Sequence, residues 1–152
     1  MRDVYEKLER IFGPDFVQRY KQRQQELATL PEEWIEKAFN DTIEQLKFSP
    51  DFRAKWIDPR GREWDVLILQ IPLKTFEIQE TQSGSFRYPL VWLGTTSASP
   101  FVSAFFPTRE MAEKVADPAN AGVPIFVVGT LREREVEGET MYSINVRGMK
   151  II

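Results

Sequence analysis

The 152-residue chain contains no cysteine and no histidine. Without cysteine there are no disulfide bonds and no thiolate catalysis, and without either residue there are no zinc-finger sites and no Ser-His or Cys-His nucleophile pairs. Histidine is also the usual general base near neutral pH. We therefore do not expect an enzyme. The two absences, together with many Arg, Glu and Lys residues, favour a thermophilic source.

Long apolar runs and nucleotide-binding loops are missing as well. No run approaches the roughly 20 residues that span a bilayer, and the charged, amphipathic N-terminus does not resemble a signal peptide. We expect a cytoplasmic protein with no membrane partner. Neither a Walker loop nor a G-x-G-x-x-G motif after a strand occurs, so no cofactor is expected. The acid pairs Asp58–Asp65 and Glu77–Glu80 could in principle bind a divalent cation, which keeps a metal-dependent activity as a third, minor hypothesis. We predict no metal site.

The chain also has little net charge, which is −3. Residues 1–50 carry 8 basic and 10 acidic side chains, and residues 51–152 carry 12 and 13. This balance disfavours strong binding to duplex nucleic acid, because that affinity comes largely from neutralised phosphates. Single-strand binding is still allowed, since base stacking contributes to it and a local basic groove is enough.

Two regions follow from the hydrophobic patterning. Residues 1–50 are predicted to form a helical segment that is interrupted at Gly13-Pro14 and resumes from Asp15 through Leu27. A further helix starts at Pro31 and ends before Ser49-Pro50. Residues 51–152 are predicted to form an antiparallel β domain. Its strands cover 52–58, 63–71, 74–80, 86–93 and 100–106, and a helix capped by Thr108 precedes a final hairpin.

The hairpin from Pro124 to Ile152 carries the most information. Glu137-Gly138 is predicted to form its tight turn, which pairs Val136 with Glu139. The same register pairs Arg134 with Met141, Arg132 with Ser143 and Val128 with Arg147. One face is then apolar core. The other mixes arginine, amide, hydroxyl and apolar groups, and runs from Phe126 to Arg134 and from Met141 to Met149.

The run GTLREREVEGETMYSINVRGMKII resembles the last hairpin of the OB-folds in archaeal replication-protein-A-type single-stranded DNA-binding proteins. The resemblance covers residues 51–152 in the order of elements and this hairpin in residues. It implies an α+β fold in which N-terminal helices precede a mostly antiparallel sheet. That sheet would form an OB-like five-stranded barrel, with one helix before the last hairpin. It also implies single-stranded DNA binding and a role in DNA replication or repair.

Aromatic and basic residues interleave on the predicted strands, as single-strand binding requires. The predicted nucleic-acid contacts are Arg53, Lys55, Trp56, Arg60, Arg62, Tyr88, Trp92, Arg132, Asn145 and Arg147. Many aromatics must instead fill the core, because such rings dominate protein interiors. The glutamates around the turn make the hairpin tip acidic, so contacts are expected near Thr130, Asn145 and Arg147.

Two functions stay open on the sequence alone. The first is single-stranded nucleic-acid binding, with DNA favoured over RNA, through stacking and a short basic groove. The second is a protein-interaction or assembly subunit without nucleic-acid affinity, which the acidic net charge supports. In either case the N-terminal amphipathic helices either pack on the sheet of their own chain or join a second copy or a protein partner.

Overall fold

The computed structural model describes residues 6–7, 10–15, 29–94 and 100–152. The chain divides into two compact units, Met1–Leu30 and Pro31–Ile152. In the first, Gly13 has a φ of 87° between helical residues, which agrees with the predicted interruption. The predicted segment from Phe16 to Leu27 lies outside the described residues. Within the described residues, no helix is long and apolar enough to cross a bilayer.

Helix α3, Glu32–Phe48, begins the second unit as the sequence predicts. Pro31 stands at its N-cap with Glu32 and Glu33 in the first turn, where acidic groups stabilise the positive end of the helix. Its buried face consists of Ile35, Ala38, Thr42 and Leu46. The compact unit includes this helix together with the strands. A separate domain over residues 1–50 stays a prediction.

Seven strands form one sheet in the described residues, in the order β1-β2-β6-β7-β5-β4-β3. They are β1 Arg53–Ile57, β2 Glu63–Gln70, β3 Gln79–Glu80, β4 Phe86–Val91, β5 Phe101–Phe106, β6 Pro124–Val136 and β7 Glu139–Ile151. Gln70 of β2 also pairs with Val91 of β4, which closes β2, β6, β7, β5 and β4 into a ring. The OB-like five-stranded barrel predicted from the sequence is confirmed.

Helix α4, Arg109–Ala116, lies between β5 and the final hairpin, where the prediction put it. The Thr108 hydroxyl caps it by accepting a hydrogen bond from the Met111 N–H at 3.2 Å. Its buried residues, Ala112 and Val115, join the barrel core. One expected strand is much shorter than predicted. Of residues 74–80, only Gln79 and Glu80 pair with a neighbour.

The turn and outer register of the β6–β7 hairpin match the prediction. Glu137 and Gly138 have φ values of 53° and 82°, as a type I′ turn requires. The predicted pairs Val136–Glu139, Arg134–Met141 and Arg132–Ser143 all occur. The predicted pair of Val128 with Arg147 is wrong, because a β-bulge inserts one extra residue into β7 there. Val128 faces Gly148 and Gly129 faces Val146, which leaves Arg147 in the bulge.

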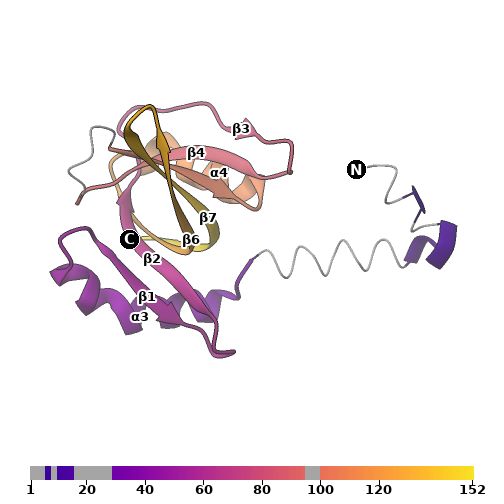
Figure 1. Ribbon diagram of the computed structural model, residues 1–152, viewed down its shortest axis with the longest axis horizontal. Coiled ribbons are helices and arrows are strands. Elements are labelled where there is room, and N and C mark those ends of the chain that lie inside the picture. The colour runs from indigo at the N-terminus through magenta and orange to yellow at the C-terminus, as the bar shows by residue number, and fades with distance from the viewer. Residues whose placement is uncertain (1–5, 8–9, 16–28, 95–99) are drawn as a thin grey trace. The chain divides into compact units, whose positions relative to one another are not determined.

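Helix α3 covers the base of the hairpin on the outside of the barrel, and it lies on a different side from α4 (Figure 1). The ring of Phe39 meets that of Phe126 edge to face, with centroids 5.3 Å apart. Ile35 fills the space in front of Gly148. The side chains of Phe126 and Val128, which point out of the barrel, are therefore fully buried as well. This corrects the expectation that the polar face of the hairpin begins at Phe126, because that face opens only at Thr130.

Candidate nucleic-acid interface

The outward side chains of four neighbouring strands line up in rows across the barrel. The first row joins Arg87 of β4, Phe105 of β5, Asn145 of β7 and Thr130 of β6 through successive pairings. The second row joins Pro89, Ser103, Ser143 and Arg132 in the same way. Residues between the rows, such as Tyr88 and Ala104, are buried in the core. The closed barrel thus holds the rows in fixed register.

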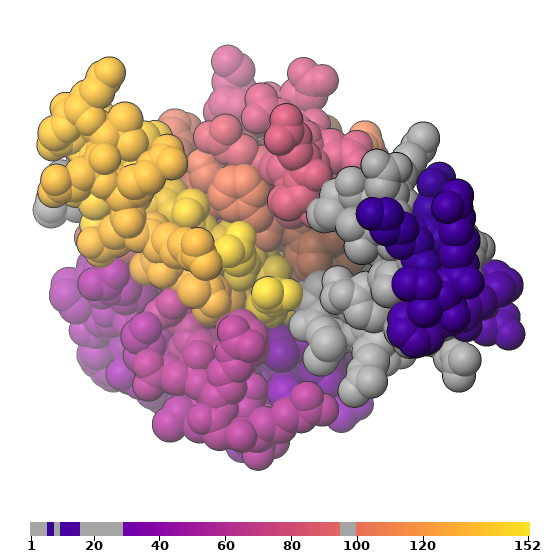
Figure 2. Space-filling model, turned by 45° about the vertical axis from the view of Figure 1, so that its right-hand side comes forward, coloured from indigo at the N-terminus to yellow at the C-terminus, as the bar shows by residue number. Residues whose placement is uncertain are grey.

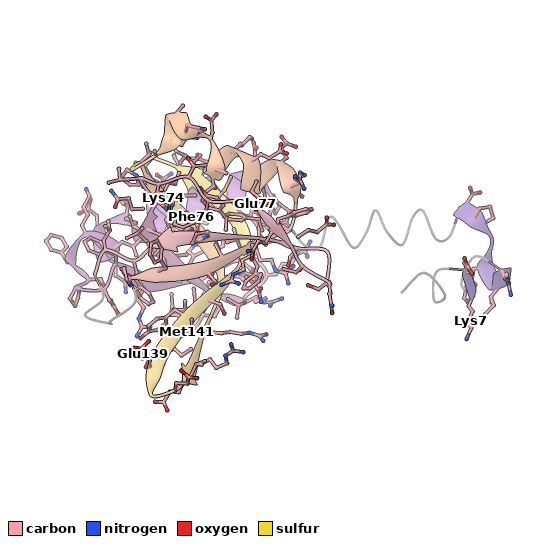
Figure 3. All side chains as sticks on the ribbon, turned by 90° about the horizontal axis from the view of Figure 1, so that it is seen from above. Lys7, Lys74, Phe76, Glu77, Glu139 and Met141 are labelled. Atoms are coloured by element: carbon pink, nitrogen blue, oxygen red, sulfur yellow. The ribbon has the colours of Figure 1, made fainter. Side chains whose placement is uncertain are left out.

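These rows border a hollow of about 410 Å³, which we call the arginine groove. The residues that line it come from β4, β5 and both strands of the hairpin: Arg87, Ser103, Phe105, Arg132, Glu133, Arg134, Met141, Tyr142 and Ser143. Beyond Gly129 the hairpin leaves β2 and projects as an arm, residues 130–141, which stands out in orange and yellow in Figure 2. Figure 3 shows Glu139 and Met141 on this arm. The groove therefore runs from the barrel surface onto the arm.

The charges on the arm are segregated by face. Arg132 and Arg134 alternate with Glu133 and Glu135, so arginines and glutamates occupy opposite faces of β6. The Glu133 carboxylate lies 3.8 Å from the Arg53 guanidinium on the other side of the arm. Within the described part of the chain, Arg132 and Arg134 form no ion pair. Among its described residues, the lining of the groove therefore has three arginines and a single acidic residue, Glu133, and is positive overall although the chain is acidic.

A second group of arginines, which we call the turn patch, lies at the β1–β2 turn and the bulge in β7. Arg60 lies 5.4 Å from the ring centre of Trp34, and Arg62 lies 4.1 Å from that of Trp64. Burial lowers the pKa of Arg147, and the nearby positive charge of Arg62 lowers it further. The structure thus brings together three predicted contacts that are far apart in the sequence.

The carboxylate of Asp58 builds the turn that carries Arg60 and Arg62. It accepts the backbone N–H of both arginines, at 2.8 and 3.0 Å, and the indole N–H of Trp64 at 2.8 Å. Burial alone would raise the pKa of Asp58, but these hydrogen bonds outweigh it and the pKa lies below its usual value. Asp58 therefore acts as a structural anion that orders the turn.

The three predicted stacking aromatics lie in the core. Trp56, Tyr88 and Trp92 are 3%, 1% and 4% exposed, so none of their rings presents a face to a ligand. Their polar atoms are also engaged: the indole N–H groups of Trp56 and Trp92 donate to Asp41 and to the Asp51 carbonyl, respectively. In this structure none of the three rings is open to stacking, because Trp56 is covered from the side of α3 and Tyr88 and Trp92 belong to the barrel core.

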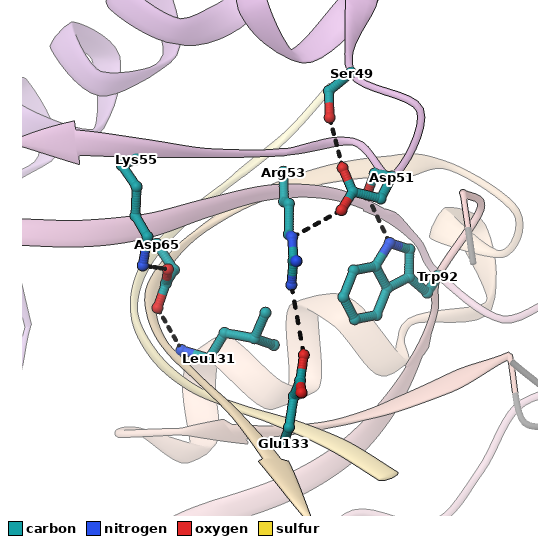
Figure 4. A network of polar contacts seen from close by, with 8 residues as sticks. All are labelled: Ser49, Asp51, Arg53, Lys55, Asp65, Trp92, Leu131 and Glu133. Atoms are coloured by element: carbon teal, nitrogen blue, oxygen red, sulfur yellow. Dashed lines mark hydrogen bonds and ion pairs between the residues drawn. The ribbon is translucent and has the colours of Figure 1, made fainter. Parts of the chain in front are cut away.

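Arg53 and Lys55 belong to a separate polar network, drawn in Figure 4. Arg53 pairs with Asp51 at 2.7 Å and approaches Glu133, and Lys55 pairs with Asp65. Asp65 also accepts the backbone N–H of Leu131 at 2.8 Å, where β6 leaves β2. This network lines a different hollow of about 460 Å³. The two cations are thus apart from the arginine groove and the turn patch, and Arg53 lies instead 5.9 Å from the ring centre of Trp92.

The residues that sequence reasoning missed are Arg87, Ser103 and Phe105. Their signal was present, because Arg87 lies between Phe86 and Tyr88 in alternation, and a charged residue at mid-strand marks the solvent face. The prediction followed the aromatic face of that strand instead. Of the two acid pairs, Asp58 and Asp65 have structural roles through the hydrogen bonds described above. Among the described residues, no group of three or more acidic side chains could hold a metal ion.

No protein-family model matches the chain. No curated protein matches its sequence. Among solved structures, the small single-stranded DNA-binding protein of Streptomyces coelicolor is similar, with a TM-score of 0.42 and 18% identity over 59% of this chain and 93% of that chain. The single-stranded DNA-binding protein of Thermus aquaticus is similar with a TM-score of 0.39 and 17% identity over 62% of this chain.

A deletion mutant of the Thermus aquaticus protein gives the same TM-score of 0.39 at 18% identity. The chain spans 44% of the length of each Thermus aquaticus structure. At these identities and TM-scores the likeness is distant. These structures are bacterial, and the resemblance of the hairpin to archaeal proteins stays a prediction.

Proposed function

We propose that this chain binds single-stranded nucleic acid, with DNA favoured over RNA, in the arginine groove. The observation that carries the proposal is the grouping of Arg87, Arg132 and Arg134 around the half-buried ring of Phe105. Guanidinium groups bind phosphates, and an aromatic ring stacks on a base of any identity. The groove therefore offers both parts of sequence-tolerant recognition of a single strand.

The polar groups around the ring support the same function. Ser103, Ser143 and Asn145 lie beside Phe105 in the rows and offer donors and acceptors to base edges or phosphates. The arm carries glutamates at its tip, where Glu137 and Glu139 are exposed. A strand bound to the arginines would avoid this tip, because phosphates and carboxylates repel each other. Binding is thus proposed at the base of the arm and on the barrel.

The test is the fluorescence anisotropy of an end-labelled oligothymidylate of about 16 nucleotides, the upper end of the site size of one OB barrel. Tryptophan quenching is a poor signal here, because Trp56, Trp64 and Trp92 are buried. We expect binding at about 50 mM salt that weakens steeply by about 200 mM. An oligouridylate of equal length tests the DNA preference.

The matched variants are Arg87→Gln, which removes a charge from the groove, and Lys114→Gln, which removes one from α4. Lys114 is exposed and pairs only weakly with Glu110, at 3.8 Å. Arg87→Gln is expected to weaken binding and Lys114→Gln to leave it unchanged. No anisotropy change at about 100 µM protein and about 50 mM salt would contradict the proposal. Self-association in light scattering, without binding, would favour an assembly subunit.

A further inference from the structure

The turn patch lies at the edge of the closed ring of strands. Arg60 and Arg62 belong to the turn between β1 and β2, outside the ring of β2, β6, β7, β5 and β4, whereas Arg147 lies in the bulge of the ring strand β7. Arg60 and Arg62 form no ion pair in the described part of the chain. Their guanidinium groups instead rest on indole rings, 5.4 and 4.1 Å from the ring centres. The two exposed guanidinium groups therefore lie against aromatic rings and form no ion pair with a described residue.

Contact with an indole ring does not use the hydrogen-bond donors of a guanidinium. Within the described residues, Arg60 and Arg62 donate hydrogen bonds only from their backbone N–H groups, so their side-chain N–H groups are available to a phosphate. The guanidinium side chain also loses less conformational entropy when a phosphate binds, because its contact with the ring already restricts it. The Asp58 carboxylate is buried beneath the turn and engaged by three donors, so its charge is offset locally.

Polar residues connect the turn patch to the arginine groove. Asp65 pairs with Gly129, so Trp64 and Thr130 each lie one residue beyond that pair. Thr130 pairs with Asn145, and Asn145 pairs with Phe105 in the groove. From β2 to β5 this path crosses three strand spacings, about 14 Å along the sheet. No acidic side chain belongs to this row of described residues.

We infer that the turn patch is a second phosphate-binding site. One nucleic-acid strand would bind to both the arginine groove and the turn patch, and would pass over Thr130 and Asn145 between them. The inference rests on the proposed function of the groove. It assigns this chain a ligand longer than the groove alone would hold. Strands too short to reach the patch bind in the groove only, and longer strands gain further phosphate contacts.

The experiment compares Arg60→Gln/Arg62→Gln with the charge-matched control Lys47→Gln/Lys114→Gln. Anisotropy is measured with oligothymidylates from about 4 to about 16 nucleotides. For the unmodified chain we expect the affinity to rise sharply once the oligonucleotide is long enough to reach from the groove to the turn patch. The Arg60→Gln/Arg62→Gln variant should not show this rise, and its affinity for the shortest strands should be within about twofold of that of the unmodified chain. Its salt slope on the longest strand should fall by about 1.4, at about 0.7 for each lost phosphate.

A second variant separates charge from folding. Arg60→Lys/Arg62→Lys keeps both cations and should restore most of the salt slope, and urea unfolding reports the stability of every variant. The inference is overturned if the Gln variant binds oligothymidylates of every length as tightly as the unmodified chain does. It is also overturned if the Gln variant loses affinity by the same factor at every length, or if its affinities equal those of the control variant. If the unmodified chain binds no length at all, the groove proposal itself fails. If the unmodified chain binds strands of all lengths with the same affinity, the groove proposal stands and only the inferred contact with the turn patch fails.

Discussion

Arg87 donates a hydrogen bond from Nη2 to the hydroxyl oxygen of Ser103, 3.0 Å away across β4 and β5. The bond holds the guanidinium against the barrel surface beside Phe105. Ser103→Ala keeps every charge of the groove but frees this side chain. We expect about a two- to fivefold loss of affinity for oligothymidylate with an unchanged salt slope, since about 1 kcal/mol of positioning is lost. A fall in the salt slope would contradict a positioning role.

Phe105 is the half-buried ring at the centre of the groove. Phe105→Leu keeps an apolar side chain but removes the stacking surface. We expect affinity to fall by about 1–3 kcal/mol, the contribution of one stacked base. The salt slope should not change, because no phosphate contact is lost. Phe48→Leu, at an 84% exposed ring on the end of α3, is the control and should bind normally.

Arg132 is exposed and faces Ser143 across the hairpin. Arg132→Gln removes one cation from the groove and is expected to lower the slope of log K against log salt by about 0.7. Affinities measured from about 50 to about 200 mM salt give this slope. Glu135→Gln on the opposite face removes a charge of the other sign and should leave the slope unchanged. An equal change in both variants would mean that net charge alone controls binding.

Asp58→Asn tests the structural anion of the β1–β2 turn. The amide accepts less well than the carboxylate, so we expect a loss of about 1–3 kcal/mol in unfolding free energy at pH 7. The folded pKa of Asp58 lies below the unfolded value of about 3.9, because its hydrogen bonds outweigh burial. Its stabilisation is full above that value and disappears as the pH falls through the folded pKa.

The difference in stability between Asp58→Asn and the unmodified chain should therefore shrink as the pH is lowered below the unfolded pKa of about 3.9. Urea unfolding at several pH values measures it, and taking the difference removes the contribution of other carboxylates. Glu63→Gln, at an exposed carboxylate on the next strand, serves as the control with little effect at any pH. A difference that grew on acidification would contradict the sign of the pKa shift.

Two glycines of the hairpin are expected to differ in their tolerance of alanine. A Cβ at Gly129 would lie 2.0 Å from the Asn145 carbonyl oxygen, and that backbone is fixed by the strand pairing. A Cβ at Gly148 would meet the end of the Ile35 side chain, which has other rotamers. Gly129→Ala should therefore destabilise the protein more than Gly148→Ala in urea unfolding. The reverse order would mean that the hairpin backbone around Asn145 adjusts to an added methyl group more easily than Ile35 of α3 does.

Local signals were enough for most of the fold. The type I′ turn at Glu137-Gly138, the Thr108 cap and the start of α3 all depend on neighbouring residues and appear where predicted. The bulge at Arg147 carries no such local signal, and the Ile35 side chain that packs beside it at Gly148 is more than a hundred residues away in the sequence. The burial of Phe126 under Phe39 is likewise a tertiary effect that no local pattern encodes.

The candidate site was predicted less well, for a related reason. Arg132 and Asn145 were found because hairpin alternation separates the polar face from the core. Tyr88 was placed at the site because an aromatic residue beside a charged residue fits a core position and a stacking position equally well. Only the closed ring decides between them, by turning Tyr88 inward and leaving Arg87 outward.

The bulge adds its extra residue to β7 alone, so the alternation of β6 runs without interruption from Val128 to Arg134. Arg132 and Arg134 therefore take their side of the arm from the same alternation that places Phe126 and Val128 beneath α3. In β7, the extra residue keeps Asn145 and Gly148 on one face although they are three residues apart, because Asn145 pairs with Thr130 and Gly148 with Val128. One added residue thus lets the covered base and the basic arm share a single continuous face of the hairpin.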